Sequence, residues 1–152
     1  MPADSNTRAA LVDSLNTLLA DSFALYVKTK NFHWHVRGPR FHDLHLLFDT
    51  QAAEIFALTD VIAERVRKNG APTLTSLGSL NGKARIAGQD KTDLSPEAMI
   101  AELVDDNRTF LAAIREAKAA AGAAGDNATE GMADDWTDQA EQRVWFLSQL
   151  LA

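Results

Sequence analysis

The histidines of this chain are the residues with the clearest potential for metal chemistry. All four, His33, His35, His42 and His45, fall within the segment 33-HWHVRGPRFHDLH-45. The chain has no cysteine, so a thiolate site is excluded and a metal would need imidazole or oxygen ligands. His45 and Asp49 have the four-residue helical spacing that lets two side chains hold one ion, although an ordinary imidazole–carboxylate contact would explain them equally well.

A second candidate pair, Asp60 and Glu64, follows further along the chain. Two like charges four residues apart on a helix repel each other, which a cation bound between them would relieve. Alternatively, both are solvated and Glu64 forms an ion pair with Lys68. Asp49 and Asp60 are eleven residues apart, roughly 16 Å of helical rise, so one metal cannot contact both pairs of one chain. An antiparallel two-fold partner could bring the pairs together, and symmetry would then give two equivalent sites per dimer.

His33 precedes a Gly-Pro interruption at residues 38–39, and an antiparallel helix pair would place it beside His45. We therefore expect His33 to join the His45 half-site, although a lone histidine at a helix end is usually a capping or packing residue. His35 and His42 are expected to point elsewhere and not to bind the metal.

Helical periodicity accounts for most of the chain. It predicts long helices over 11–33, 39–68, 96–121 and 127–150. Residues 70–95 form a long connection, in which Thr75 is expected to cap a short helix over 76–80. The pattern predicts an all-α, ferritin-like four-helix bundle with a short helix in the connection between the second and third helices, and a single domain over 1–152.

The second long helix is predicted to have two faces. One is a core stripe, formed by Leu47, Phe48, Ile55, Leu58, Ile62 and Val66. The other has small residues in its middle and ionisable residues at its ends, and consists of His45, Asp49, Ala52, Ala53, Phe56, Asp60, Ala63 and Glu64. Small residues allow another helix to approach closely, so this second face is expected to be an intrachain packing seam or a dimer interface.

These residues form the ordered pattern H-x11-H-x3-D-x10-D-x3-E, which resembles the Dps family, also called mini-ferritins or starvation-inducible DNA-binding proteins. Further matches are His33-Trp34, Arg37-Gly38, Phe41, 63-AER-65 and 143-RVWFL-147. The resemblance implies a hollow dodecamer of four-helix subunits that oxidises Fe(II), preferably with hydrogen peroxide and otherwise with oxygen, and stores the ferric product as mineral.

The resemblance also implies which residues bind iron. His33, His45 and Asp49 of one subunit would face Asp60 and Glu64 of its two-fold mate, with zinc as a substitute metal. Trp34 resembles the tryptophan that lies near this centre in the family and is expected either to intercept stray oxidising equivalents or simply to pack.

The resemblance further implies acidic pores near the start of the fourth helix, where this chain reads 126-DNATEGMADD-135. Gly131 stands where an aspartate is frequent, so the predicted pore residues are Asp126, Glu130 and Asp134. Acidic residues at a helix N-terminus are equally explained by the helix dipole.

Charge and composition limit the other functions. The net charge is −6 and neither end of the sequence is rich in lysine, so DNA binding is expected to be weak at most. No signal-like or membrane-spanning stretch is present in the sequence, and we expect a cytoplasmic protein, able to associate with the nucleoid, without membrane partners. Two alternatives remain: a nucleoid-compacting shell with structural metal sites, and a ferritin with a di-iron site inside each bundle, for which the Glu-x-x-His motif is missing.

Overall fold

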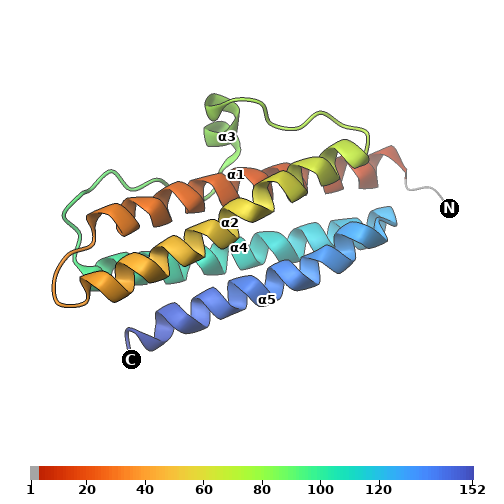
Figure 1. Ribbon diagram of the computed structural model, residues 1–152. Coiled ribbons are helices and arrows are strands. Elements are labelled where there is room, and N and C mark those ends of the chain that lie inside the picture. Colours follow the sequence, from red (N-terminus) through yellow and green to blue (C-terminus); the bar gives the residue numbers. More distant parts are fainter. Residues whose placement is uncertain (1–3) are drawn as a thin grey trace.

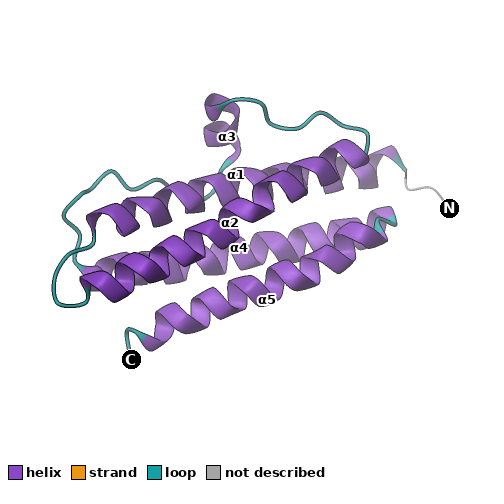
Figure 2. Cartoon of the chain, viewed as in Figure 1, coloured by secondary structure: helices purple, strands orange, loops and turns teal. Residues whose placement is uncertain are grey.

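The computed structural model describes residues 4–152, which contain helices and no strand. The helices are α1 (Ser5–His35), α2 (Phe41–Lys68), α3 (Leu77–Lys83), α4 (Pro96–Ala124) and α5 (Asn127–Gln149) (Figures 1 and 2). The predicted all-α bundle, with a short helix in the connection between the second and third long helices, is confirmed.

The four long helices pack as two hairpins. α1 packs against α2 and α4, and α4 packs against α5, while α3 lies outside the bundle and contacts α1 (Figure 1). The shared core is aliphatic and aromatic, and Leu15, Phe48 and Phe110 in it are fully buried. Within residues 4–152, no helix is both long enough and apolar enough to cross a membrane.

Local caps extend α1 and α4 beyond the ends that periodicity alone predicted, whereas α2 begins two residues later and α5 ends one residue earlier than predicted. α1 begins at Ser5, because the Asp4 side chain accepts a hydrogen bond from the Thr7 backbone N–H at 2.8 Å. α4 runs past the predicted end at residue 121, because the alanine-rich segment is helical until Gly125, whose φ of +72° is the left-handed conformation that ends helices.

The predicted cap of the short helix was wrong by one residue. α3 begins at Leu77, and Ser76 caps it by accepting the Ser79 backbone N–H at 3.1 Å. The Ser79 hydroxyl in turn accepts the Ser76 backbone N–H at 3.0 Å, so the two serines form a reciprocal capping box. Thr75 has no such reciprocal partner three residues later, which explains why Ser76 is the cap.

The two faces predicted for α2 are present but divided differently. Ala52, assigned to the second face, is fully buried in the bundle, whereas Phe56 on the same predicted face is 50% exposed. The outward part of α2 therefore carries a large aromatic side chain without a covering element.

Candidate metal centre

His33 and His45 are brought together by the hairpin between α1 and α2, as predicted. Their rings stack with centroids 3.9 Å apart and an interplanar angle of 11°. The connecting turn reverses the chain through Gly38, whose φ of +107° strongly favours glycine. Phe41, at the start of α2, lies 5.0 Å from His45 between ring centroids. The two imidazoles thus form part of a short aromatic stack at one end of the bundle.

Each histidine is oriented by the backbone of the other. Nδ1 of His33 lies 2.6 Å from the His45 carbonyl oxygen, and Nδ1 of His45 lies 2.7 Å from the His33 carbonyl oxygen. A carbonyl oxygen can only accept a hydrogen bond, so each Nδ1 donates its proton. In the neutral ring this leaves a lone pair on Nε2, which is the form that binds a metal.

Asp49 supplies the carboxylate next to this pair. Its Oδ1 lies 3.7 Å from His33 Nε2 and accepts a hydrogen bond from Lys30 Nζ at 2.8 Å. The hydrogen bond from Lys30 is the main cause of a pKa of Asp49 below its usual value, with smaller contributions from charges nearby. A negative oxygen thus lies close to the Nε2 of His33, with the ring of His45 stacked beside it, and ligands of these types suit a divalent metal such as Fe(II) or zinc.

Asp60 and Glu64 lie elsewhere on α2 and are exposed. No group of three or more His, Asp or Glu side chains able to hold a metal exists within residues 4–152 of a single chain. Of the five predicted ligands, one chain places His33 next to both His45 and Asp49 and leaves Asp60 and Glu64 apart from them, and the described part of the chain does not by itself complete a metal site.

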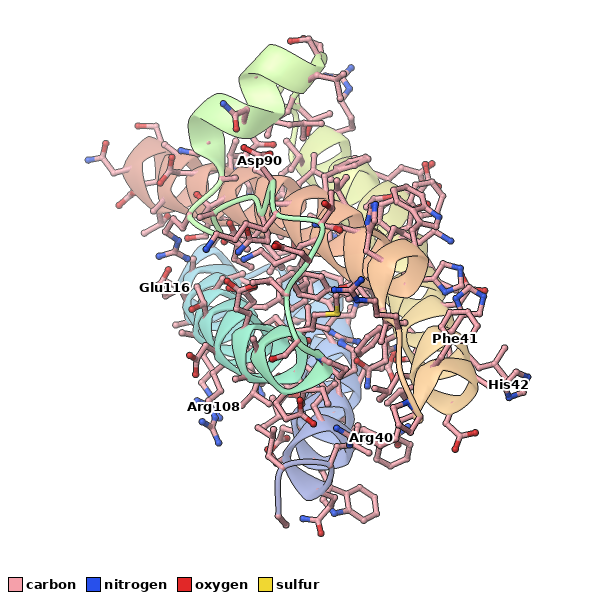
Figure 3. The ribbon with its side chains drawn as sticks, turned by 90° about the vertical axis from the view of Figure 1, so that its left-hand side faces the viewer. Arg40, Phe41, His42, Asp90, Arg108 and Glu116 are labelled. Carbon is pink, nitrogen blue, oxygen red and sulfur yellow. The ribbon has the colours of Figure 1, made fainter. Side chains whose placement is uncertain are left out.

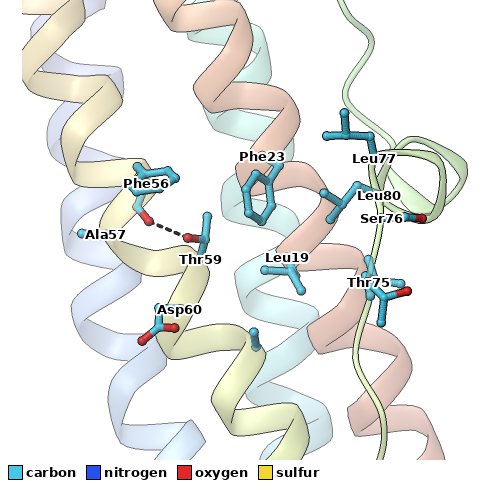
Figure 4. Close-up of a pocket in the computed structure, with 12 residues that line it drawn as sticks. Leu19, Phe23, Phe56, Ala57, Thr59, Asp60, Thr75, Ser76, Leu77 and Leu80 are labelled. Carbon is cyan, nitrogen blue, oxygen red and sulfur yellow. Dashed lines mark hydrogen bonds between the residues drawn. The ribbon is translucent and has the colours of Figure 1, made fainter.

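Asp60 borders a groove of about 780 Å³ between α1, α2 and α3. Figure 4 shows Phe56 beside Asp60 on α2, with Phe23 of α1 and Leu77 of α3 further across the groove. Leu77 is 84% exposed, so much of the apolar lining faces solvent in the single chain. The carboxylate half of the predicted site is thus continuous with an uncovered apolar surface.

The other two histidines lie apart from the pair. His35 Nδ1 is 2.9 Å from the Asn31 carbonyl oxygen, and its side chain is exposed. His42 is 81% exposed, and Figure 3 shows it projecting away from the bundle, while Phe41 turns back along it. Neither residue takes part in the contacts among His33, His45 and Asp49.

The three residues predicted for a pore have different surroundings. Asp126 accepts hydrogen bonds from Arg65 Nη2 at 2.7 Å and Asn69 Nδ2 at 2.8 Å, and it caps α5. Asp134 pairs with Lys118. The Glu130 carboxylate covers Gly122, where it leaves no room for an added Cβ. Their assignment to a pore stays a prediction. The side chain of Asp126 is already used to cap α5 and to bind Arg65 and Asn69.

Two polar groups near the bundle were missed by the sequence reasoning. One is Lys30, which precedes His33 by almost one helical turn and shares its side of α1. The other is Arg143, which is only 1% exposed and donates from Nε to Asn107 Oδ1 at 2.8 Å. The spacing between Lys30 and His33 was a usable signal, whereas Arg143 looked like an ordinary polar position on a surface helix.

Comparison with known proteins establishes the family of this chain. The ferritin-like domain family matches residues 12–152. A DNA protection during starvation protein of Brevibacillus brevis is 33% identical over 137 residues, which cover 90% of this chain and 91% of that protein. This chain belongs to the Dps family of ferritin-like proteins.

Solved Dps structures have the same fold. The crystal structure of Dps from Thermosynechococcus elongatus superposes with a TM-score of 0.94 at 26% identity, over 97% of this chain and 94% of that one. The Dps protein of Vibrio cholerae O1, described as a ferritin-like diiron-carboxylate protein, superposes with a TM-score of 0.92 at 27% identity, over 99% and 94% of the two chains. The Dps fold therefore extends over nearly the whole chain.

Proposed function

We propose that this Dps-family protein is a ferroxidase and iron store that oxidises Fe(II), preferably with hydrogen peroxide, inside a dodecameric shell. The observation that carries the proposal is the pair of stacked histidines with both Nδ1 atoms bound to carbonyl oxygens. This arrangement leaves the Nε2 lone pair of both rings free for a metal, and the Nε2 of His33 lies 3.7 Å from Asp49 Oδ1.

The missing ligands would come from a second subunit. Asp60 and Glu64 are too far along α2 to reach the histidines of their own chain, but Asp60 borders the exposed apolar groove and Glu64 is an exposed residue one helical turn further on. A two-fold related copy covering that groove would place its own His33, His45 and Asp49 against them. Each dimer would then contain two complete sites, and six dimers would make the shell.

Iron is the substrate of the proposed reaction. Two Fe(II) ions each give one electron to one hydrogen peroxide molecule, whose O–O bond breaks to give two hydroxide ions and two Fe(III) ions. Because both electrons reach the peroxide at one site, no hydroxyl radical is released. Imidazole and carboxylate ligands suit Fe(II), and the carboxylates also stabilise the Fe(III) product.

Trp34 is the residue that we expect to protect the chain from stray oxidation. It follows His33 directly in the sequence and is 61% exposed, so ordinary core packing does not account for it. We propose that its indole gives up an electron to oxidising species that escape the centre. DNA binding is not part of the proposal, because a net charge of −6 opposes attraction to phosphates.

The proposal predicts that either half of the site is indispensable. We expect the variants Asp60→Ala/Glu64→Ala and His33→Ala/His45→Ala to lose at least about 100-fold in the rate of Fe(II) oxidation by peroxide, since each removes two ligands. The measurement is the absorbance of ferric product after anaerobic loading with Fe(II). His42→Ala is the matched control and should keep the wild-type rate, because His42 lies outside the centre.

Mixed assembly tests whether the site is shared. Subunits of the two inactive variants, dissociated and reassembled together, should regain part of the activity because some interfaces then combine an intact half from each chain. Each variant reassembled alone should stay inactive. Wild-type rates in both variants would refute the ligand assignment, and no recovery on mixing would refute the shared geometry.

A further inference from the structure

Two polar side chains are buried inside the bundle, apart from the candidate metal centre. Gln51 of α2 is 3% exposed and Arg143 of α5 is 1% exposed. Neither polar atom of the Gln51 amide has a hydrogen-bond partner within residues 4–152, and the same holds for Nη1 and Nη2 of Arg143. Buried polar groups are nearly always hydrogen-bonded, because an unpaired one has lost its water without replacement. These side chains therefore need a partner that the helices do not supply.

The two side chains share one side of α2. Nη1 of Arg143 lies 3.5 Å from Oε2 of Glu54, too long for a good hydrogen bond, and Gln51 precedes Glu54 by nearly one helical turn. Nε of Arg143 donates to Oδ1 of Asn107 on α4 at 2.8 Å, which fixes the guanidinium among three helices. The unpaired groups of Gln51 and Arg143 thus lie on neighbouring turns, where α2 faces α5, without a direct bond between them.

The charges at this position restrict the chemistry of the partner. The guanidinium of Arg143 repels a metal ion, and the carboxylate of Glu54 repels an anion. Arg143 offers only donors, whereas the amide of Gln51 offers donors and an acceptor. The partner must therefore be neutral, must accept from Arg143 and must be able to donate to Gln51. Water meets these requirements, and a buried water typically makes about three hydrogen bonds.

Glu54 connects this part of the interior with the surface. Its side chain is 34% exposed and borders a groove of about 370 Å³ between α2 and α5, together with residues that include Asp138 and Gln142. Arg143 lies directly behind Glu54 as seen from the groove, because its own side chain is buried and the two charged groups are 3.5 Å apart. A water molecule in the groove therefore has only Glu54 to pass on its way to Arg143.

We propose that Gln51 and Arg143 form a water-binding site inside each bundle, which is filled from the groove past Glu54 and excludes ions. Such a site accounts for a charged guanidinium within an aliphatic and aromatic core, since ordered water replaces the acceptors that the helices lack. None of its residues is a proposed iron ligand. The inference therefore goes beyond the proposed function and does not depend on it.

A high-resolution crystal structure of the assembled protein tests the site directly. We expect an ordered water within hydrogen-bond distance of both the Gln51 amide and an Nη group of Arg143. In crystals soaked with Mn²⁺, anomalous scattering should place no ion there. A manganese ion between Gln51 and Arg143, or the lack of any ordered water beside them, would overturn the proposal.

The stability of Gln51→Met provides an independent test in solution. Methionine keeps the length of the side chain and removes the amide. If the amide binds water that also serves Arg143, the urea midpoint should fall by about 0.5 M at a fixed protein concentration. If the amide were dry and unpaired, the same substitution would remove a buried unsatisfied group and raise the midpoint.

Gln142→Met is the matched control, because it changes an exposed glutamine at the groove and should leave the midpoint unchanged. A midpoint of Gln51→Met equal to or above that of wild type would overturn the water-binding role, whatever the fate of the metal centre. A Gln51→Met protein that does not fold would leave the decision to the wild-type crystal structure, which requires no variant.

Discussion

At the scale of single residues, Arg143 is a charged side chain buried inside the bundle. Its guanidinium is almost completely buried, with Nη1 at 3.5 Å from Glu54 Oε2 and Nε bound to Asn107. Burial lowers the pKa of Arg143 to about 10, and the charge of Glu54 opposes this shift. The residue therefore stays charged at neutral pH, so its few partners within the helices matter energetically.

We expect Asn107→Leu to lower the free energy of unfolding by about 2 to 3 kcal/mol, because it leaves a buried charged donor without its acceptor. The double variant Asn107→Leu/Arg143→Met should be more stable than Asn107→Leu, since replacing both buried polar partners by apolar groups is often nearly neutral. Urea unfolding monitored by circular dichroism measures both. A double variant less stable than Asn107→Leu would contradict this account of Arg143.

The metal-binding residues show what sequence could and could not predict. His33 and His45 follow from the position of the turn, and Asp49 from its spacing to His45, because helical geometry fixes these relations in advance. The reciprocal Nδ1–carbonyl contacts could not be predicted, because they depend on the rotation of both rings. Lys30 was missed for a related reason: most lysines on an amphipathic helix extend into solvent.

At the scale of helices, a polar network joins the end of α2 to the start of α5. Asp126 accepts from Arg65 and Asn69, and the Asn69 side-chain oxygen accepts from Arg8 Nη1 of α1. Desolvation opposes ionisation of Asp126, but the hydrogen bonds from Arg65, Asn69 and Thr129 outweigh it and hold the pKa of Asp126 well below its usual range. Three helices are thus tied together at the end of the bundle opposite the histidines.

Asp126→Ala should lower the free energy of unfolding by about 2 to 4 kcal/mol at pH 7, because α5 loses its cap and Arg65 loses its ion-pair partner. A carboxyl group with a lowered pKa in the folded state stabilises the protein above its unfolded pKa of about 3.9. This contribution is lost as the pH falls further toward the folded pKa. The difference in unfolding free energy between wild type and variant should therefore shrink below about pH 4.

Urea unfolding at several pH values measures this prediction. Asp138→Ala is a suitable control, since Asp138 is an exposed residue later in the same helix. An unchanged difference between pH 7 and pH 3 would show that Asp126 acts by packing and not by its charge.

Helix existence was predictable and helix ends were not. The apolar positions at helical spacing are numerous enough to identify four long helices. The ends depend on single contacts, such as the capping box of Ser76 with Ser79 and the left-handed Gly125. Several neighbouring residues could make those contacts equally well on sequence grounds, which is why the short helix was placed one residue too early.

At the scale of the whole molecule, the exposed groove is the feature least compatible with an isolated chain. Phe56 is half exposed and Leu77 is almost fully exposed, on opposite borders of one groove. Large contiguous apolar surfaces usually mark an interface. Since Asp60 borders the same groove, the proposed assembly and the proposed chemistry depend on one surface.

Phe56→Asp should therefore prevent assembly, because it places a charge in the surface that we expect a second copy to cover. Analytical ultracentrifugation should detect small species in place of the shell, with the helical circular dichroism spectrum retained. Ferroxidase activity should fall together with assembly, although no ligand has been changed. A fully assembled and active Phe56→Asp protein would contradict this use of the groove.

The turn between α1 and α2 has a consequence for how this protein can change over evolution. Residues 36–40 determine how far His33 lies from His45, and each ring is bound to the backbone of the other helix. Inserting or deleting one residue there would change how the end of α1 lies against the start of α2 and disturb both contacts at once. Most surface loops tolerate changes in length. This turn should not, because its length sets the distance between His33 and His45. We therefore expect its length to vary as little in evolution as the identity of the ligands.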